Sequence, residues 1–366
     1  MEGSGKSQET RSTDTDPAAI AAGVTHHPLR LIIDRAALAA NWRWLAETAN
    51  TACGAAIKAD GYGLGARETL DALAAAGCRD FFVSTWAEAE ALGAVPEGAS
   101  LSVLHGVGPD DVDAALASGA RPVLNTAEQV ARWRQIAEDR TCDVMVDTGM
   151  NRLGLRVDEI PLLDGLEIDT CMSHLACADE DHQLNRTQLS RFFDVRDAVT
   201  AQRYSLANSA GICLGRDYAF DLVRPGLALY GGIPRYNAEG HISQVAHLEA
   251  QVVQRRTIRA GESCGYGATF TADRHTEAAV VNIGYADGYW RGFSNAGGAS
   301  VGGVELPVLG RVSMDLVILG CDEAKDIREG DWIELDFELR EAAAASGMSQ
   351  YELLTGLGDR FERRWR

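Results

Sequence analysis

The chain has 366 residues, of which 46% are hydrophobic and 24% charged, an ordinary composition for a folded protein of one or two domains. Its 53 acidic residues outnumber its 34 basic residues and give a net charge of -19, so no nucleic-acid partner is expected. No apolar run approaches the roughly 18 residues of a membrane-spanning helix, so no membrane partner is expected either.

The N-terminal segment and the cysteines point to a cytoplasmic protein. Residues 1–28 are polar and lack the apolar stretch of a secretion signal, so we predict a disordered tail. The eight cysteines are scattered without a CxxC pair, as is usual for buried small side chains in a reducing compartment. Cys171 and Cys177 flank His174, but this spacing is unlike that of zinc sites, and no metal is predicted.

Helical and strand-like segments alternate over residues 29–245. Asp34 can cap a helix in which Leu38, Trp42 and Leu45 repeat at helical spacing. Eight short apolar runs follow, separated by amphipathic stretches: 54–60, 81–85, 101–106, 121–125, 143–147, 168–175, 204–208 and 222–231. Apolar runs that alternate with helices are typical of a parallel sheet covered on both faces. We therefore predict a (β/α)8 barrel of the TIM type; an open doubly wound sheet is the alternative, although no GxGxxG turn follows the first run.

The pattern changes near residue 246. Residues 247–337 contain β-rich segments separated by Gly and Asp turns, so we predict that residues 246–366 form a separate, mostly antiparallel β domain. A short helix over residues 349–357 and an arginine-rich segment close the sequence.

The strand-end positions of the predicted barrel carry an unusual set of side chains. In such barrels the carboxyl ends of the strands line the active site. Each residue alone has an ordinary interpretation, such as a solvated lysine at a strand end or a histidine in the core. Together they form a set of cations, hydroxyls and glycine with few acids: Lys58, Tyr62, Arg152, His174, Asn208, Ser209, Arg224 and Gly226. The combination indicates an active site.

This set suits an enzyme that binds pyridoxal 5'-phosphate. A lysine in a partly desolvated pocket near other cations has a lowered pKa and can form a Schiff base with an aldehyde. Pyridoxal phosphate carries such an aldehyde on a ring that accepts electrons from the substrate α-carbon. Its phosphate would be bound by hydroxyls and backbone amides, here those of Tyr62, Ser209, Gly226 and Leu227. Arg224 would reach the pyridine nitrogen, and Arg152 the ring phenolate.

Several motifs resemble those of one family. "AAIKADGYGLG", "DTGMNRLG", "SHLACAD", "ANSAG" and "VRPGLALYG" are similar to the fold-type III pyridoxal-phosphate enzymes. "CGYGATFTA", "IGYADGY" and "GRVSMD" narrow the resemblance to the alanine racemase family, over roughly residues 29–366. The resemblance implies interconversion of L- and D-alanine by a cytoplasmic homodimer with two shared active sites, which supplies D-alanine for bacterial peptidoglycan.

The resemblance also implies roles for individual residues. Lys58 would hold the cofactor and act as one base, and Tyr266 of the partner subunit would be the base on the opposite face. The phosphate side would comprise Tyr62, Asn208, Ser209, Gly226 and Leu227. Arg152 would bond the ring phenolate and help to place the substrate carboxylate. Met314 and Asp315 would be partner-chain positions near that carboxylate, and Tyr285 would also bind the substrate. Tyr285 and Tyr230 would be further pocket or phosphate-network tyrosines, and entrance positions would be Asp179, Arg291 and Arg311.

The resemblance implies how a tyrosine works as a base. A free tyrosine has a pKa of about 10 and needs help to accept a proton near neutrality. In the family, the residue matching His174 contacts this tyrosine and is linked to Arg224 at the pyridine nitrogen. Arginine does not readily release a proton, so the pyridine nitrogen would stay unprotonated. That disfavours a long-lived carbanion and favours racemisation over decarboxylation or transamination.

Two positions depart from the family pattern. Met145 stands where many members carry a carbamylated lysine, and Gly358 stands near the position expected for a C-terminal phosphate-side tyrosine. Three other functions stay open. A racemase of broader specificity is one, because a methylene changes binding by only about 1–3 kcal/mol. A decarboxylase would normally carry an acid where Arg224 stands, and a non-catalytic pyridoxal-phosphate carrier would not need Tyr266.

Overall fold

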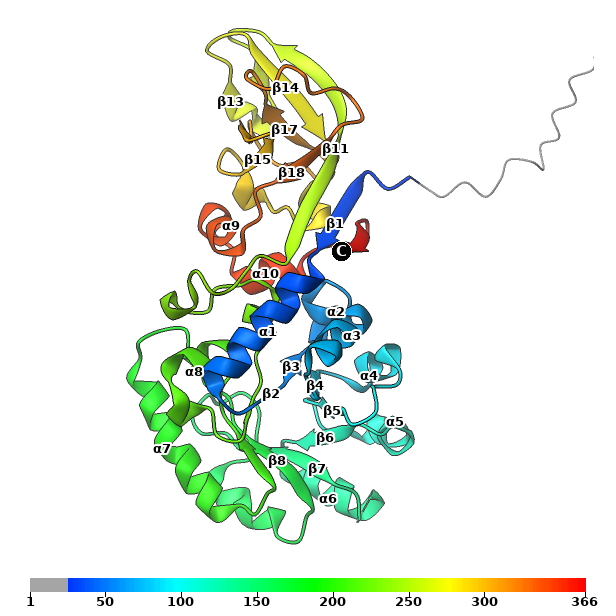
Figure 1. Ribbon diagram of the computed structural model, residues 1–366, viewed down its shortest axis with the longest axis vertical. Coiled ribbons are helices and arrows are strands. Elements are labelled where there is room, and N and C mark those ends of the chain that lie inside the picture. Colours follow the sequence, from blue (N-terminus) through cyan, green and yellow to red (C-terminus); the bar gives the residue numbers. More distant parts are fainter. Residues whose placement is uncertain (1–25, 138) are drawn as a thin grey trace, which may run out of the picture.

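The computed structural model describes residues 26–366 except residue 138, so most of the tail predicted over residues 1–28 lies outside the described residues. The described chain has two parts, a barrel built around parallel strands and an elongated β domain (Figure 1). The C-terminus lies at the β domain, beside the first strand of the chain (Figure 1).

Eight parallel strands form the barrel. They are β2 (Ala52–Cys53) continued by β3 (Ala55–Ala56), β4 (Asp80–Val83), β5 (Ser100–Val103), β6 (Arg121–Leu124), β7 (Cys142–Met145), β8 (Ile168–Met172), β9 (Arg203–Ser205) and β10 (Leu222–Val223). Strands β3 to β9 pair in chain order, and β10 pairs in parallel with β2. The Arg224 amide donates to the Ala207 carbonyl at 2.9 Å, which joins β10 to the end of β9 and closes the ring. The predicted (β/α)8 barrel is confirmed.

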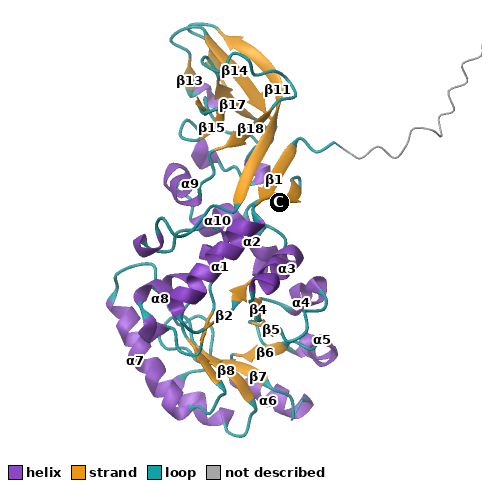
Figure 2. Cartoon of the chain, in the orientation of Figure 1, coloured by secondary structure: helices purple, strands orange, loops and turns teal. Residues whose placement is uncertain are grey.

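Helices cover the outside of the barrel (Figure 2). They are α1 (Arg35–Ala49), α3 (Ala66–Ala76), α4 (Trp86–Leu92), α5 (Val112–Ala117), α6 (Ala127–Ile136), α7 (Gln183–Ala198) and α8 (Ser209–Leu214). Side-chain caps explain where they begin: Asp34 accepts the Ala37 amide at 2.8 Å at the start of α1, and Thr126 caps α6 in the same way. Within the described residues, no helix is both long enough and apolar enough to cross a membrane.

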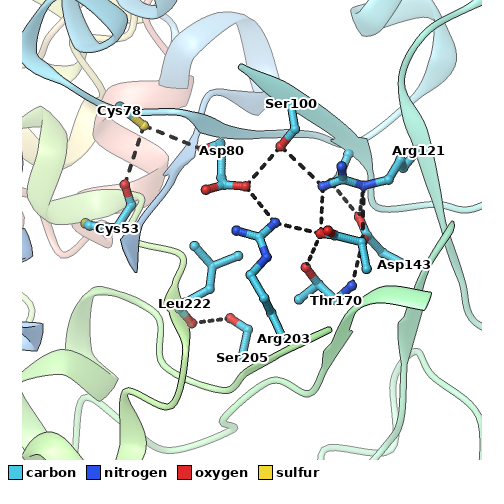
Figure 3. Close-up of polar contacts among 12 residues, drawn as sticks. Cys53, Cys78, Asp80, Ser100, Arg121, Asp143, Thr170, Arg203, Ser205 and Leu222 are labelled. Atoms are coloured by element: carbon cyan, nitrogen blue, oxygen red, sulfur yellow. Dashed lines mark hydrogen bonds and ion pairs between the residues drawn. The ribbon is translucent and has the colours of Figure 1, made fainter. Parts of the chain in front are cut away.

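Side chains fill the inside of the barrel in two sets. One is an apolar layer of Phe82, Val123, Met145, Met172 and Leu222. The other lies at or near the first residues of the strands, and we call it the floor network: Asp80, Ser100, Arg121, Asp143 and Arg203, labelled in Figure 3, together with Asp169. Within it, Arg203 donates to Asp80 at 2.8 Å and to Asp169 at 2.6 Å. Because the interior is filled, the barrel has no central channel, and a ligand site is expected at the carboxyl ends of the strands.

The β domain is built from strands at both ends of the chain. They are β1 (Leu29–Ile33), β11 (Ala246–Ile258), β12 (Ser263–Cys264), β13 (Phe270–Thr271), β14 (Thr276–Val281), β15 (Gly298–Val301), β16 (Val304–Pro307), β17 (Val317–Gly320), β18 (Trp332–Leu335) and β19 (Glu362–Trp365), with helices α9 (Leu339–Ser346) and α10 (Gln350–Thr355). The main sheet has the order β16-β15-β18-β11-β1-β19, and β14 joins β11 to β17. Every pairing in this domain is antiparallel except that of β1 with β19. The mostly antiparallel β fold is confirmed.

The structure differs from the predicted domain range 29–245 at its first strand. Strand β1 does not join the barrel but pairs with β11, Leu29 lying opposite Ala250, and with β19 on its other edge. Leu29, Leu31 and Ile33 are buried in the β domain, as expected for a strand with one apolar face. A five-residue apolar strand before a helix has the same local pattern in either domain, and only its distant partners distinguish the two.

Candidate active site

A cavity of about 1030 Å³ opens at the carboxyl ends of the barrel strands. Its wall contains the whole cofactor-side set predicted from the sequence: Lys58, Tyr62, Arg152, His174, Asn208, Ser209, Arg224, Gly226 and Leu227. Asp179, expected at the entrance, also lines the cavity. One chain therefore brings together residues that the sequence spreads over several barrel strands and loops.

Lys58 lies where strand β3 runs into a left-handed turn. Ile57 before it is fully buried. In the following segment α2 (Lys58–Tyr62), φ is 52° at Ala59, 51° at Asp60 and 61° at Gly61. Such φ values cost residues other than glycine about 1–2 kcal/mol each. The turn therefore persists because contacts around it hold it in place.

Contacts from separate segments hold this left-handed turn. The Ala59 amide donates to Oε1 of Glu88 in α4 at 2.8 Å. The Asp60 carboxylate accepts the amide that begins α3, also at 2.8 Å. The Gly63 carbonyl accepts two N–H groups of Arg363, from β19, at 3.1 and 2.9 Å. The sequence analysis assigned a role to neither Glu88 nor Arg363.

The surroundings of Lys58 favour its neutral amine. Burial lowers the pKa of Lys58, and the positive charge of Arg152 lowers it further, while the negative charge of Glu88 acts in the opposite direction. A lowered pKa increases the fraction of unprotonated amine, which is the form that attacks an aldehyde.

One side of the cavity offers hydroxyl and amide groups. The Ser209 hydroxyl accepts the amides of Gly226 and Ala228 at 3.0 and 3.2 Å, and the Leu227 amide between them has no acceptor within the described residues. The Tyr62 hydroxyl approaches Gly226 so closely that a β-carbon at this position would clash with it. A concave group of amides and hydroxyls of this kind can bind a phosphate.

Arg224 is a buried cation in the cavity wall. Its guanidinium donates to the Ser173 carbonyl at 2.6 Å and to the Ser205 hydroxyl. Burial lowers its pKa to about 10, against the opposing effect of the Asp143 carboxylate. The side chain is therefore protonated at neutral pH, and its hydrogen bonds fix the direction of the guanidinium.

His174 follows strand β8 and lines the same cavity. Burial lowers its pKa to about 3, and the positive charges of Arg224, Arg152 and Lys58 contribute in the same direction. Its ring is therefore neutral at physiological pH and keeps one nitrogen that can accept a hydrogen bond.

Tyr266 does not line the cavity of its own chain. It lies at a tip of the β domain, in a 3₁₀ turn (Tyr266–Ala268) between the paired strands β12 and β13. Gly265 and Gly267, on either side of it, both have a φ of 73°, which explains the glycines of this motif. The Tyr266 side chain is 71% exposed, so it is free to meet a second molecule.

The other predicted β-domain residues also lie outside this cavity. Met314 is 52% exposed, and its carbonyl accepts the amide that follows Tyr285, so these two segments lie together. Asp315 pairs with Arg360 at 2.7 Å. Arg291 places its guanidinium 5.1 Å from the centre of the Tyr285 ring. The structure thus divides the predicted site into a cavity set and a β-domain set.

Comparisons with known proteins identify the family. A family model described as the alanine racemase N-terminal domain matches residues 33–234, and one described as the C-terminal domain matches residues 245–365. The chain belongs to the alanine racemase family. It is 42% identical to an alanine racemase of Methylobacterium nodulans, over 93% of this chain and 96% of that protein. It is also 42% identical to a catabolic alanine racemase of Agrobacterium fabrum, over 94% and 92% of the two chains.

Solved structures agree with this assignment. The crystal structure of alanine racemase from Bartonella henselae, with covalently bound pyridoxal phosphate, is 37% identical in sequence and has a TM-score of 0.86. It covers 93% of this chain, which spans 100% of that one. The biosynthetic alanine racemase of Pseudomonas aeruginosa is 32% identical with a TM-score of 0.84, over 93% and 100% of the chains. The resemblance found in the sequence is confirmed.

Against the alanine racemase pattern, position 145 has a packing explanation. Met145 is buried in the apolar layer of the barrel and reaches the cavity wall. Arg152 is exposed, and its side chain has no hydrogen bond or ion pair within the described residues. The loop that carries it is ordered by Asp147, whose carboxylate accepts two backbone amides at 2.7 and 2.9 Å. Arg152 is therefore positioned by an ordered loop and not by a charged side chain at position 145.

The helix α10 adds a tyrosine to the cavity that the sequence analysis missed. Tyr351 lines the wall, and its ring centre is 6.3 Å from that of Tyr62. The family pattern places a C-terminal tyrosine near Gly358, but Gly358 lies against Asp287, whose carbonyl accepts its amide at 3.3 Å. A tyrosine is therefore present on the Tyr62 side of the cavity, seven positions earlier in the sequence than expected.

Tyr230 and the cysteines have structural positions. Tyr230 is fully buried, stacks on Tyr62 with 4.6 Å between ring centres, and donates to the Ala56 carbonyl at 2.8 Å. It packs against Tyr62 and does not itself line the cavity. All eight cysteines are free thiols. Across the described part of the chain, no three His, Cys, Asp or Glu side chains are placed to hold a metal ion.

Proposed function

We propose that this protein interconverts L-alanine and D-alanine with pyridoxal 5'-phosphate as its cofactor. The observation that carries the proposal is the cavity that Lys58, Arg224 and His174 line together with a set of phosphate-side donors, in a chain of the alanine racemase family. The relatives named above, over most of their length, support alanine as the substrate.

The cavity fits this cofactor at both of its ends. Lys58 is the lysine of the wall, and its pKa is lowered by burial and by Arg152, so it is suited to hold the cofactor aldehyde. At the other end, the phosphate would be bound by the Ser209 and Tyr62 hydroxyls and by the Leu227 amide, which has no acceptor among residues 26–137 and 139–366. When bound, pyridoxal phosphate supplies a ring that accepts electrons and so acidifies the α-proton of the amino acid.

Two bases on opposite faces would exchange the proton. Racemisation removes the α-proton from one face of the substrate and returns a proton to the other face, so each face needs a group that can hold it. Nζ of Lys58 serves one face. The phenol oxygen of Tyr266 of the partner subunit serves the other, and its exposure at the domain tip supports this role.

During this exchange His174 would stay neutral and Arg224 would stay protonated. The neutral His174 ring, whose pKa is lowered to about 3 by burial and nearby cations, can accept a hydrogen bond from Tyr266 of the partner subunit. Arg224, with a pKa of about 10 after burial, keeps its protons at neutral pH. Because Arg224 keeps its protons, the pyridine nitrogen of the cofactor would stay unprotonated. This favours return of the α-proton over decarboxylation or transamination.

The β-domain set supports a homodimer with shared sites. Tyr266, Met314 and Asp315 lie outside the cavity of their own chain, and the first two are strongly exposed. In the partner subunit's cavity, Met314, Asp315 and Tyr285 would approach the substrate carboxylate together with Arg152. We further propose that the enzyme acts in the cytoplasm and supplies D-alanine for peptidoglycan; the relatives include proteins named for both the biosynthetic and the catabolic direction.

The deciding experiment uses the scarcity of lysine in this chain, which contains only Lys6, Lys58 and Lys325. We expect Lys58→Ala to abolish the yellow colour that borohydride bleaches and to lower alanine racemisation by roughly 10⁴-fold or more, because the cofactor loses its covalent attachment. The variant should also fail to support growth of a bacterium that requires D-alanine.

Lys325→Ala is the matched control, because Lys325 does not line the cavity, and it should behave like the wild type. Colour and turnover retained in Lys58→Ala would refute the proposal. Turnover of serine, lysine or arginine by the wild type at rates equal to that of alanine would instead favour a racemase of broad specificity.

A further inference from the structure

The carboxylate of Glu88 serves two different segments at once. Its Oε2 accepts the amides of Ser84 and Thr85 at 2.6 and 3.3 Å, and the Thr85 hydroxyl in turn accepts the Glu88 amide, which completes the capping box that begins α4. Its Oε1 accepts the amide of Ala59, the residue directly after Lys58, at 2.8 Å. One side chain therefore links the end of strand β4 to the turn that carries Lys58.

This second contact distinguishes Glu88 from the other capping glutamates of the chain. In the described part of the chain, Glu352, at the start of α10, accepts only the amide and hydroxyl of Ser349, within its own helix start. Glu159 accepts the amide of Arg156, again within its own segment. A capping box needs no contact outside the helix, so the bond from Glu88 to the Lys58 turn has another purpose.

The turn that Glu88 holds is strained and needs support. Ala59 and Asp60, which follow Lys58, both adopt left-handed backbone conformations. Non-glycine residues leave this region unless their surroundings hold them there. The Ala59 amide is the first donor after Lys58, so the bond to Glu88 fixes the peptide plane from which the Lys58 side chain departs.

Glu88 is also the negative charge that faces Lys58. The charged groups around the amine are Arg152 from the loop after β7 and Glu88 from α4. His174, after β8, is the other titratable neighbour, and its ring is neutral. Without Glu88 the amine would therefore face only burial and a positive charge.

We propose that Glu88 is a positioning residue for Lys58: its carboxylate ties the turn after Lys58 to the start of α4 and thereby fixes the direction in which the amine enters the cavity. The inference rests on the proposed function, in which Lys58 holds the cofactor. On this proposal the first turn of α4 supports the active site, although it acts through the Lys58 turn and without contact to cofactor or substrate.

The test measures the amine directly in protein stripped of cofactor. Reductive methylation is followed over a range of pH, and the initial rate at Lys58 is read by mass spectrometry. Lys325 in the same molecule is the internal reference. The variants are Glu88→Gln, Glu88→Asp and, as matched control, Thr85→Ala, which removes the hydroxyl half of the same capping box but leaves the carboxylate in place.

In Glu88→Gln we expect the pH midpoint of Lys58 methylation to move down by at least about half a unit, because the lost negative charge had favoured the protonated amine. The midpoint of Lys325 should not move. In the cofactor-loaded enzyme, kcat should fall about tenfold or more with a smaller change in KM, because the amine is misdirected. Glu88→Asp keeps the charge but not the reach, so it should restore the midpoint and not kcat.

Thr85→Ala should match the wild type in both measurements. The proposal is overturned if Glu88→Gln keeps the wild-type midpoint and kcat, or if Thr85→Ala reproduces its effects, because Glu88 would then act only as a helix cap. If Glu88→Gln does not fold, a wild-type kcat in Glu88→Asp is enough to overturn it. Failure of the proposed function would appear separately, as wild-type protein without cofactor colour or racemase activity.

Discussion

His174 is a histidine whose neighbours are cations. Arg224, Arg152 and Lys58 all add positive charge, and burial acts in the same direction, so its pKa falls to about 3. A histidine chosen to carry charge would have a carboxylate beside it. This one is kept neutral, as its proposed role as hydrogen-bond partner of a tyrosine base requires.

The depressed pKa of His174 predicts how stability depends on pH. Above a pH of about 6.5 the residue is neutral in the folded and the unfolded chain, and it adds no pH dependence. As the pH falls from about 6.5 towards 3, only the unfolded chain takes up this proton, so the free energy of unfolding decreases by up to about 1.4 kcal/mol per pH unit. His174→Asn should remove this component in urea unfolding of the cofactor-free protein.

The exposed His275 provides the control for that measurement, because His275→Asn should leave the slope as it is in the wild type. An equal slope in wild type and His174→Asn would show that His174 takes up its proton in the folded protein too.

Whether a single site residue could be predicted from the sequence depended on where its partners lie. Lys58 and Arg224 could be predicted because both end barrel strands, and the barrel itself has a strong periodic pattern. Glu88 could not, because its sequence shows only the local T-x-x-E capping box, and its second partner belongs to another unit of the barrel. Tyr351 was missed because it reaches the cavity from a helix of the β domain, far along the chain.

At the scale of the strands, the two ends of the barrel divide function from stability. The carboxyl ends carry the cavity, and the first residues of the strands carry the floor network (Figure 3). In that network the fully buried Asp143 accepts the Ser102 hydroxyl at 2.6 Å and the Thr170 amide at 3.0 Å, and Arg121 lies 3.3 Å from it. This network could not be predicted, because the strand starts give no local signal of how their charges pair.

Arg121→Met should destabilise the barrel without harming the active site. It leaves the buried Asp143 without its cation, and breaking a buried pair in this way costs about 3–5 kcal/mol. Burial already raises the pKa of Asp143 against the effect of Arg121, so the substitution raises that pKa further. We expect a fall of this size in the free energy of urea unfolding, while kcat at low temperature is unchanged.

Arg156→Met is the matched substitution, because Arg156 pairs with Asp158 at 3.1 Å with both side chains more than 70% exposed. Its effect should stay within about 1 kcal/mol. Equal effects of the two substitutions would mean that the floor network does not stabilise the barrel.

For the whole molecule, the β domain serves two sites. Through α10 and β19 it supplies Tyr351 to the cavity of its own chain and Arg363 to the Lys58 turn. Through its exposed tip it presents Tyr266, which in the proposed dimer enters the cavity of the partner subunit. Figure 1 shows the two ends of this domain, α10 beside the barrel and β13 at the far end.

Hybrid dimers test this sharing. Lys58→Ala and Tyr266→Phe chains should each be inactive alone, but co-expressed chains should recover activity. A hybrid then has one site with both wild-type residues, so random pairing of equal amounts restores about a quarter of the sites. Hybrids purified through two different tags should show half of the wild-type racemase activity, and the unfractionated mixture about a quarter.

Each variant co-expressed with itself is the control and should stay inactive. Purified hybrids without activity would show that Tyr266 acts within its own chain, and an active Tyr266→Phe homodimer would show that Tyr266 is not required.

Strand β1 has a consequence for how the protein is made. It is among the first parts of the described chain to leave the ribosome. However, β1 can pair with β11, where Leu29 lies opposite Ala250, and with β19 on its other edge only after those strands have been synthesised. At roughly 5–20 residues per second, translation from Leu29 to Ala250 takes roughly ten to forty seconds. A strand with two open edges is a place where other chains can attach. All the barrel strands are therefore synthesised before β1 can pair, and we expect the half-synthesised chain to be more prone to aggregation than the finished enzyme.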